Sequence, residues 1–242
     1  MRILGVIPAR YNSSRFPGKP LIRIGKKTMI ESVYSQAIKC KLLSEVYVAT
    51  DDDRIFSHVK SFGGDVMMTG EHNSGTERCN ALYKNLEKEF DIIINIQGDE
   101  PFINPKQINQ VANCFLDKKT TIATLAKQIK TTEEILDENT VKILFDQNNF
   151  ALNFSRLAMP QPTSSNVKEW LIINTFYKHI GIYGYRAEAL KKICELTPTK
   201  SEISENLEQL RWLENGYKIK VGITSFESIS VDVPKDIEKL KL

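Results

Sequence analysis

The chain has 242 residues, which is enough for the core of one large α/β domain that carries an insertion. Its 33 basic and 30 acidic residues leave a net charge of +3, too weak a field to indicate nucleic acid or an anionic membrane as a partner. No segment approaches the roughly 20 apolar residues of a membrane span, and the apolar N-terminal run is too short for a signal peptide. We therefore expect a cytoplasmic protein without a membrane partner.

Strand and helix patterns alternate through the first half of the chain. Strands are expected at 3–8, 46–50, 66–68 and 92–97, and helices at 29–40, 52–62, 76–86 and 105–115. Thr28, and Asp51 or Asp52, are suitable N-caps for the first two helices. Apolar strands that do not alternate with polar residues, joined by helices, predict an open, mostly parallel twisted sheet with helices on both faces.

The pattern changes after about residue 120, where three strand-like runs have few helices between them. These runs are 122–127, 141–145 and 150–154, and the residues Asp146–Asn149 are typical of a hairpin turn. They predict an antiparallel insertion at 120–177 within a single domain spanning 1–242. Because the insertion exposes Phe and Leu, we expect a dimer contact there. The α/β pattern then resumes, with strands expected at 179–185 and 218–223 and helices at 187–194, 204–215 and from Pro234.

A basic loop follows the first expected strand and is the most informative segment of the chain. Within Ile3–Leu21, three cations (Arg10, Arg15 and Lys19) stand among small residues and prolines. Such a loop at the carboxyl edge of an α/β sheet can bind a polyanion. The spacing matches neither Walker A nor G-x-G-x-x-G, which disfavours a generic ATPase or a dinucleotide-binding fold. From spacing alone, phosphate binding and an ordinary solvated loop both stay open.

Two aspartates follow strand-like runs and are candidate metal ligands. Asp99 lies in the segment NIQGDEP (95–101), which follows three isoleucines and should stand at the carboxyl end of a strand, where ligands of open α/β sheets bind. A carboxylate in a phosphate-binding crevice can hold Mg²⁺, although G-D-E-P is also ordinary turn chemistry. Asp232 ends a second apolar run, and it could instead only cap the helix expected from Pro234. Whether the two carboxylates meet cannot be read from the sequence.

Three further segments carry polar residues whose role the residues alone leave open. Asn73–Arg78 precedes a helix and could hold a ribose or an anion, or could simply cap that helix. His179 opens a strand, and a lone histidine is more often structural. Glu205–Arg211 could be nothing more than an amphipathic helix with a charged face.

Nine segments along the chain have the character of family motifs. They are IPARYNSSRFPGKPL (7–21), VATDD (48–52), SGTER (74–78), NIQGDEP (95–101), ATLA (123–126), FSR (154–156), HIGIYGYR (179–186), LEQLRWLENG (207–216) and VDVPKDIE (231–238). Taken together, they resemble the 3-deoxy-manno-octulosonate (Kdo) cytidylyltransferases, in the order in which that family has them. The related sialic-acid activating enzymes share an opening IPAR-like loop, but GKPL, QGDEP and HIGIYGYR favour the Kdo branch.

The resemblance implies a Mg²⁺-dependent homodimeric enzyme that forms CMP-Kdo and pyrophosphate from CTP and Kdo for lipopolysaccharide synthesis. It implies that Lys19, Arg10 and Asp99 are catalytic and that Asp99 and Asp232 hold the metal. The residues that it assigns to CTP are Arg10, Ser13, Arg15, Lys19, Ser74 and Gly75. Those that it assigns to the sugar are Arg78, Gln97, Arg156, His179, Tyr185, Glu208 and Gln209.

Some residues depart from the family pattern. Family members usually have Leu at the position of Phe16 and Tyr at that of Asn153, and many have a Trp-containing segment where this chain has Met159–Thr163. The changes at 153–163 fall near the expected sugar end, so an 8-amino analogue of Kdo, or a capsule-pathway role, stays open. A sialic-type cytidylyltransferase is the second enzyme hypothesis. A non-catalytic nucleotide-sugar binding protein is the third, disfavoured because Lys19 and both carboxylates are intact.

Overall fold

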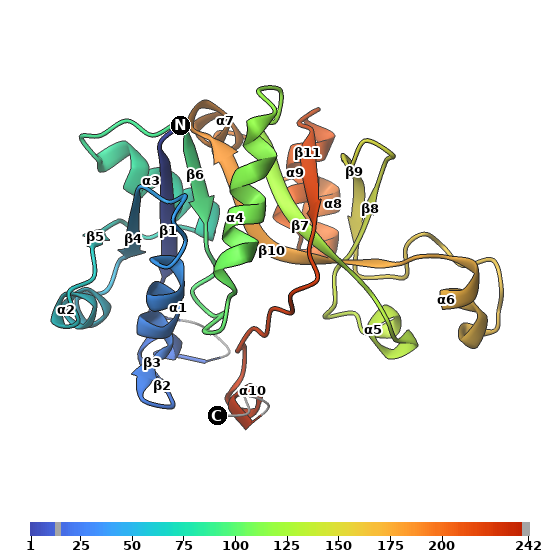
Figure 1. Ribbon diagram of the computed structural model, residues 1–242, viewed down its shortest axis with the longest axis horizontal. Coiled ribbons are helices and arrows are strands. Elements are labelled where there is room, and N and C mark those ends of the chain that lie inside the picture. Colours follow the sequence, from blue (N-terminus) through green and yellow to red (C-terminus); the bar gives the residue numbers. More distant parts are fainter. Residues whose placement is uncertain (13–15, 239–242) are drawn as a thin grey trace.

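A computed structural model describes residues 1–12 and 16–238, and its centre is a twisted open sheet (Figure 1). Seven strands of this sheet lie in the order β11-β7-β10-β6-β1-β4-β5. Most neighbouring pairs are parallel, but β10 runs antiparallel to both β6 and β7. The predicted mostly parallel sheet is confirmed, with one antiparallel strand inside it. The strands are β1 (Ile3–Ala9), β4 (Glu45–Thr50), β5 (Val66–Met68), β6 (Ile92–Asn95), β7 (Ile122–Gln128), β10 (Tyr177–Arg186) and β11 (Ile219–Ile223).

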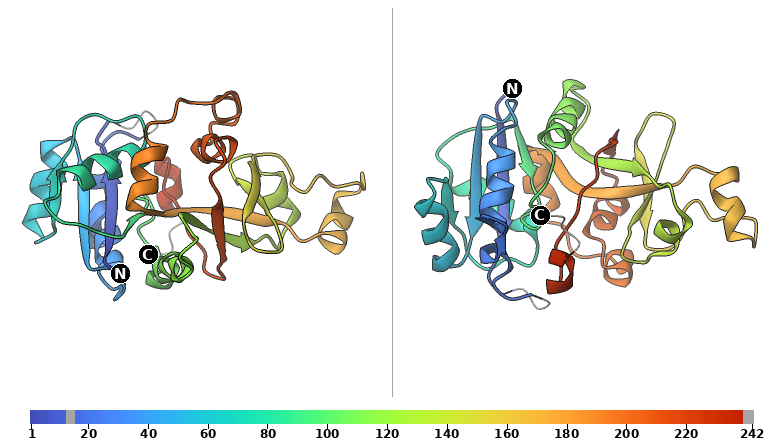
Figure 2. Two further views of the ribbon diagram at one scale, coloured as in Figure 1. Left: turned by 90° about the horizontal axis from the view of Figure 1, so that it is seen from above. Right: turned by 60° about the horizontal axis from the view of Figure 1, so that its bottom comes forward.

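Helices cover both faces of the sheet, as Figure 2 shows from above. One face packs against α1 (Met29–Ala37), α2 (Asp53–Ser61) and α4 (Pro105–Asn113), and the other against α3 (Gly75–Asn85), α7 (Ala187–Ile193) and α9 (Glu208–Glu214). The two predicted caps are confirmed, because Thr28 accepts a hydrogen bond from the Glu31 amide and Asp52 accepts one from the Arg54 amide. Across the described ranges, no helix is long and apolar enough to cross a membrane.

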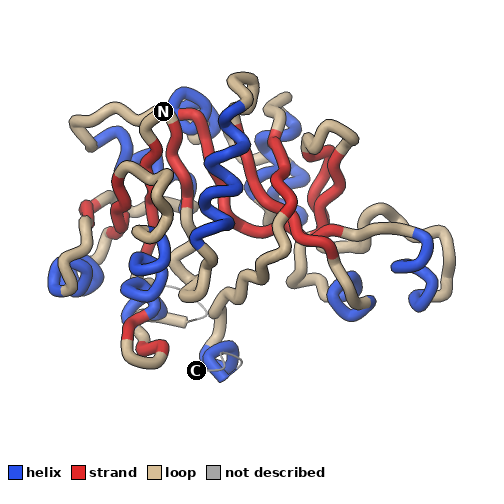
Figure 3. The backbone as a smooth tube through the Cα atoms, viewed as in Figure 1, coloured by secondary structure: helices blue, strands red, loops and turns tan. Residues whose placement is uncertain are grey.

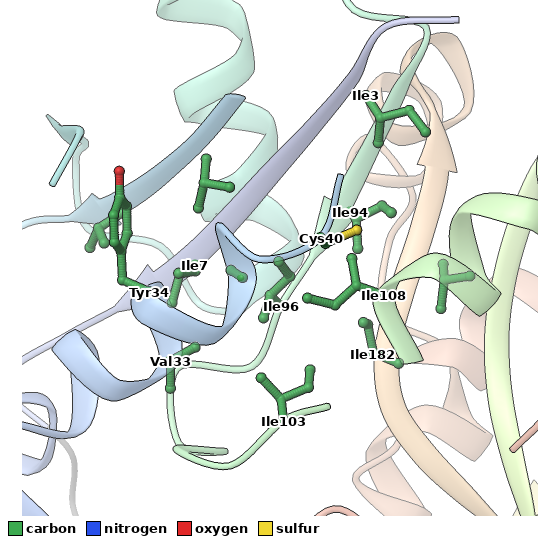
Figure 4. Packing of buried hydrophobic residues seen from close by; sticks show 14 of the residues in the cluster. Ile3, Ile7, Val33, Tyr34, Cys40, Ile94, Ile96, Ile103, Ile108 and Ile182 are labelled. Carbon is green, nitrogen blue, oxygen red and sulfur yellow. The ribbon is translucent and has the colours of Figure 1, made fainter. Parts of the chain in front are cut away.

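The core on the α1 and α4 side is built from branched aliphatic side chains. Figure 4 shows Ile7 and Ile94, from adjacent strands, packed with Val33 of α1 and Ile108 of α4, and none of the four is exposed to solvent. Burying each such side chain contributes about 1.5–3 kcal/mol. The packing fixes the carboxyl ends of β1 and β6 side by side.

The insertion contains a β-hairpin and short helices that extend from one side of the sheet (Figure 3). Strands β8 (Lys142–Phe145) and β9 (Ala151–Ser155) pair antiparallel across the predicted turn, where Asn149 has φ 58°. The range 120–177 also includes β7, which lies between β10 and β11 in the main sheet. The sequence pattern missed the short helices α5 (Thr132–Leu136), η3 (Val167–Glu169) and α6 (Trp170–Ile173).

The helix predicted at 204–215 is wrong, because two helices occupy this region. The first, α8 (Lys200–Glu205), ends at Asn206, which has φ 53° and ψ 50°. Asn is one of the few residues other than Gly that adopt this left-handed conformation at low cost. After Asn206 the chain starts again as α9. The sequence also missed a small hairpin, β2 (Arg23–Ile24) with β3 (Lys27–Thr28), and the 3-10 turn η1 (Lys19–Leu21), whereas α10 (Pro234–Glu238) begins at the predicted proline.

Candidate active site

The carboxyl ends of β1 and β6 border a cavity of about 240 Å³, which we call the main cavity. Its wall is formed by the basic loop, the N-terminus of α3, the loop after β6 and the C-terminal segment. Eight of the predicted site residues line it, namely Arg10, Lys19, Ser74, Gly75, Arg78, Gln97, Asp99 and Asp232. The predicted Ser13 and Arg15 lie outside the described residues.

Lys19 joins the two candidate metal carboxylates. Its Nζ atom lies 2.8 Å from Asp99 Oδ2 and 3.3 Å from Asp232 Oδ1, and its side chain is only 14% exposed. The preceding Gly18 has φ 73°, a conformation that favours glycine and turns the chain into η1. The structure therefore brings together three charged groups that the sequence could only place on separate segments.

The close approach of two backbone segments brings Asp99 to this edge of the sheet. A Cβ atom on Gly98 would lie 2.6 Å from the carbonyl oxygen of Pro8, so only glycine fits without a shift of the backbone. The amide of Ile96 donates to the Val6 carbonyl (2.8 Å), which continues the pairing of β6 with β1. As a result, the segment QGDEP lies directly against the start of the basic loop.

The chemistry of this carboxylate pair fits a divalent cation. Lys19 already holds positive charge between Asp99 and Asp232, which shows that their oxygens converge on one cation position. In the part of the chain that the structure describes, no group of three or more His, Cys, Asp or Glu side chains is placed to hold a metal. A pair of carboxylates suits Mg²⁺, since this ion keeps several waters and shares substrate phosphate oxygens.

The N-terminus of α3 supplies the opposite wall of the main cavity. Ser74 caps the helix by accepting from the Glu77 amide (3.2 Å), and its hydroxyl donates to Glu208 Oε1 (2.8 Å). Thr76 donates to the other oxygen of Glu208 at 2.6 Å. Burial raises the pKa of Glu208, although the hydrogen bonds from Thr76 and Ser74 oppose the shift. Glu208 thus supports the helix terminus, whose free amides and dipole favour an anion.

Arg78 lines the main cavity, and its guanidinium is held in place by an ion pair and a hydrogen bond. Its side chain is 3% exposed and forms an ion pair with Asp51 (2.6 Å), and it also donates to Thr69 Oγ1 (2.9 Å). Asp51 was expected only as a possible helix cap, and its ion pair with Arg78 was not predicted. The ion pair with this partly exposed carboxylate keeps the guanidinium in one orientation.

A second cavity of about 330 Å³ adjoins the first and shares Gln97 and Asp99 with it. Gln97 is fixed by donating from Nε2 to the Gly181 carbonyl (2.8 Å). Glu100 also lines this cavity, and burial beside Asp99 raises its pKa to about 7. The remaining lining residues are Asn139, Thr140, Val141, Lys178, His179, Ile180, Gly181, Glu227, Ser228 and Ser230.

His179 is neutral in this second cavity. Burial lowers its pKa to about 3, and its Nε2 lies 2.9 Å from Thr124 Oγ1. The Thr124 hydroxyl has a single proton, which we assign to the Ile182 carbonyl because that acceptor is the closest (2.8 Å, against 3.1 Å for the Ile180 carbonyl), and this leaves the hydroxyl oxygen to accept from the ring. The hydrogen-bond network therefore assigns the proton of His179 to Nε2.

His179 should make folding depend on pH. Its pKa in the folded protein is below the ordinary value of 6.5, so its contribution to stability is complete above about pH 6.5 and is lost as the pH falls toward 3. Between pH 6 and 5 we expect the free energy of unfolding to fall by about 1 kcal/mol more in the wild type than in His179→Asn. Urea unfolding of both proteins across this range measures the difference, and parallel curves would contradict a histidine that stays neutral in the folded protein.

Four residues expected at the sugar lie away from the surfaces of both cavities. Tyr185 is fully buried and packs against Trp212, with ring centroids 5.7 Å apart. Arg156 is held by the carbonyls of Glu205 and Glu138, and Gln209 is buried on α9. The carboxylate of Glu208 accepts hydrogen bonds from Ser74 and Thr76 at the start of α3. Asn153, one of the departures from the family pattern, is exposed on β9 and also lines neither cavity.

Comparison with known proteins shows the family to which this chain belongs. A sequence model described as cytidylyltransferase matches residues 4–219. The 3-deoxy-manno-octulosonate cytidylyltransferase of Parabacteroides distasonis is 50% identical, with 99% of this chain and 96% of that protein covered. The chain belongs to the 3-deoxy-manno-octulosonate cytidylyltransferase family. The enzyme of the same name from Bacteroides thetaiotaomicron is also 50% identical, with 98% of this chain and 96% of that protein covered.

Solved structures agree with this family assignment. The CMP:2-keto-3-deoxy-manno-octonic acid synthetase complexed with CTP has a TM-score of 0.92 and 37% sequence identity, over 99% of this chain and 97% of that one. A cytidylyltransferase from Leptospira borgpetersenii, at 19% identity and a TM-score of 0.65, covers all of this chain and 85% of its own length and shares the fold alone. The cytidylyltransferase fold predicted from the nine segments is confirmed.

Proposed function

We propose that the protein transfers the cytidylyl group of CTP to the anomeric hydroxyl of Kdo, with release of pyrophosphate. The observation that carries the proposal is the meeting of Lys19, Asp99 and Asp232 in the main cavity of a chain 50% identical to enzymes named for this reaction. The same edge of the sheet holds a basic loop and a helix N-terminus, the two features expected to bind a triphosphate.

CTP would lie in the main cavity. Arg10 and Lys19 line one wall and supply positive charge for the triphosphate, while Ser74 and Gly75 begin α3 on the other wall. Attack of the sugar hydroxyl on the α-phosphate, in line with departing pyrophosphate, requires positioning and charge neutralisation more than covalent catalysis. These residues would therefore bind and orient the nucleotide, and no protein nucleophile is needed.

Asp99 and Asp232 would hold Mg²⁺ on the side of the cavity that Lys19 occupies. When bound, the ion supplies positive charge to phosphate oxygens and lowers the pKa of a bound hydroxyl. The convergence of both carboxylates on one cation supports this assignment. Lys19 would remain close enough to share in neutralising the triphosphate.

The sugar acid would occupy the second cavity. Gln97 and Asp99 line both cavities, so a sugar hydroxyl at this shared wall would lie close to the nucleotide. Neutral His179 offers Nδ1 as an acceptor for a sugar hydroxyl, since Nε2 is engaged by Thr124. Arg78, Arg156, Tyr185, Glu208 and Gln209 stay predictions from the resemblance, and direct contact with Tyr185 would require a change of conformation because its ring is fully buried.

The decisive experiment measures pyrophosphate release from CTP and Mg²⁺ with a panel of sugar acids. We expect release with Kdo and none with CTP alone. Faster release with 8-amino-Kdo would identify that sugar as the preferred substrate of the same reaction. Release only with sialic or legionaminic acid would favour the second enzyme hypothesis, a sialic-type cytidylyltransferase. Tight CTP binding without turnover of any member of the panel would favour the non-catalytic binding protein.

We also propose a homodimer through the insertion. Several large apolar side chains there are exposed, including Leu157 (63%) and Ile172 (83%), and such side chains are common at subunit contacts. Light scattering at micromolar concentration should give twice the chain mass, and replacing Ile172 with Asp should shift the protein toward monomer. A wild-type monomer would contradict the proposal. A cytoplasmic location and the absence of nucleic-acid partners stay predictions from the composition.

A further inference from the structure

The segment 224–233, which we call the strap, connects the edge strand β11 to α10 and carries Asp232 near its end (Figure 1). It contains no helix or strand, so side-chain and backbone contacts must hold it in place. The amide of Val231 donates to the Asp99 carbonyl (2.9 Å), and the Val231 side chain is fully buried. This contact holds the end of the strap beside the loop that carries Asp99.

The beginning of the strap is held by a backbone hydrogen bond from Thr224 to the Ala126 carbonyl of β7 (2.9 Å) and, three residues later, by charge. Lys127 of β7 and Lys178 of β10 are directly opposite each other on antiparallel strands, an arrangement that is destabilising for like charges unless an anion lies between them. Glu227 of the strap supplies that anion, because one carboxylate oxygen is 2.6 Å from Lys178 Nζ and the other pairs with Lys127. The two lysines therefore fix the strap to the sheet.

A second glutamate shares one of these lysines without touching the strap. Glu134 of α5 lies 2.7 Å from Lys178 Nζ, on the side of the insertion. Burial lowers the pKa of Lys178, but hydrogen bonds to Glu134 and Glu227 outweigh this effect and keep the lysine charged. Glu134 and Glu227 thus have the same chemistry and the same partner, but only Glu227 belongs to the segment that carries Asp232.

From this arrangement we infer that Glu227 is a positioning residue for Asp232. It holds the start of the strap against β7 and β10, while Val231 holds the end, so the Asp232 carboxylate is presented to Lys19 and Asp99 in a fixed position. The inference rests on the proposed function, in which Asp232 binds the metal. Because Glu227 also lines the second cavity, its effect must be measured without the sugar.

The test compares Glu227→Gln with the matched control Glu134→Gln. Mn²⁺ is titrated into each protein with CTP present and sugar absent, and free Mn²⁺ is followed by electron paramagnetic resonance. Loss of a residue that positions a metal ligand should raise the Mn²⁺ dissociation constant on the order of tenfold in Glu227→Gln, and by less than about twofold in the control. Amide hydrogen exchange across 224–233 should become faster in Glu227→Gln only.

The conservative variant Glu227→Asp keeps the charge and should recover most of the Mn²⁺ affinity, even if Glu227→Gln melts at a lower temperature. Unchanged Mn²⁺ affinity in Glu227→Gln, or an equal loss in Glu134→Gln, would overturn the positioning role. The binding measurement does not depend on turnover. A failure of the whole panel to release pyrophosphate would therefore count against the proposed function, and the Mn²⁺ data would still decide the role of Glu227.

Discussion

Asp99→Asn is expected to lower the rate of CMP-Kdo formation on the order of a thousandfold, because it weakens the proposed metal site that would supply positive charge to the phosphate oxygens. The amide keeps the size and one oxygen of the carboxylate, so the fold should persist. Asp99 is a quarter exposed and its main ionic partner is Lys19, so the melting temperature should change little. Pyrophosphate release at saturating Mg²⁺ and CTP, together with a thermal melt, measures both effects.

The control for this variant is Asp117→Asn, which makes the same change in an exposed aspartate outside both cavities. It should leave the rate and the melting temperature unaltered. Asp232→Asn should reproduce the loss seen in Asp99→Asn, because both carboxylates meet the same cation. Full activity in Asp99→Asn would remove this residue from the mechanism.

Lys19→Gln is expected to raise the KM for CTP about tenfold to a hundredfold, which is the range for losing one charge-assisted contact to phosphate. A second effect follows from the position of Lys19 between two carboxylates. Without its ammonium group, Asp99 and Asp232 lose a shared cationic partner, and the negative charge near this position is less fully neutralised. We therefore expect Mn²⁺ to bind the nucleotide-free variant more tightly than it binds the wild type.

Steady-state kinetics with each substrate varied in turn, and Mn²⁺ titration without CTP, measure these two effects. Lys26→Gln serves as the control, because Lys26 is exposed in the small hairpin next to the basic loop and lines neither cavity. A change confined to the KM for the sugar would be inconsistent with the role assigned to Lys19.

Local features of the chain could be predicted from residue type, whereas features that depend on packing could not. The caps at Thr28 and Asp52 and the turn at Asp146–Asn149 follow from side-chain chemistry that acts within a few residues. The break between α8 and α9 depends on a single left-handed residue in a helical pattern. The antiparallel direction of β10 depends on how the chain returns from the insertion, and its apolar sequence reads the same in either direction.

The candidate site could also be predicted only in part, namely where it depends on local sequence. The sequence placed Asp99 and Lys19 at the ends of strands, and α/β sheets gather such ends at one edge. It could not show that the strap returns from β11 to bring Asp232 beside them, since this depends on the paired lysines of β7 and β10. Nor could it show that Tyr185 is buried, because its position on β10 suits either a core residue or a ligand residue.

The ion pair between Lys19 and Asp232 joins residues 213 positions apart in the chain. The proposed metal pair is therefore incomplete until almost all of this sequence has been synthesised. A fragment that ended between Asp99 and Asp232 would contain the basic loop and Asp99 but lack the second carboxylate.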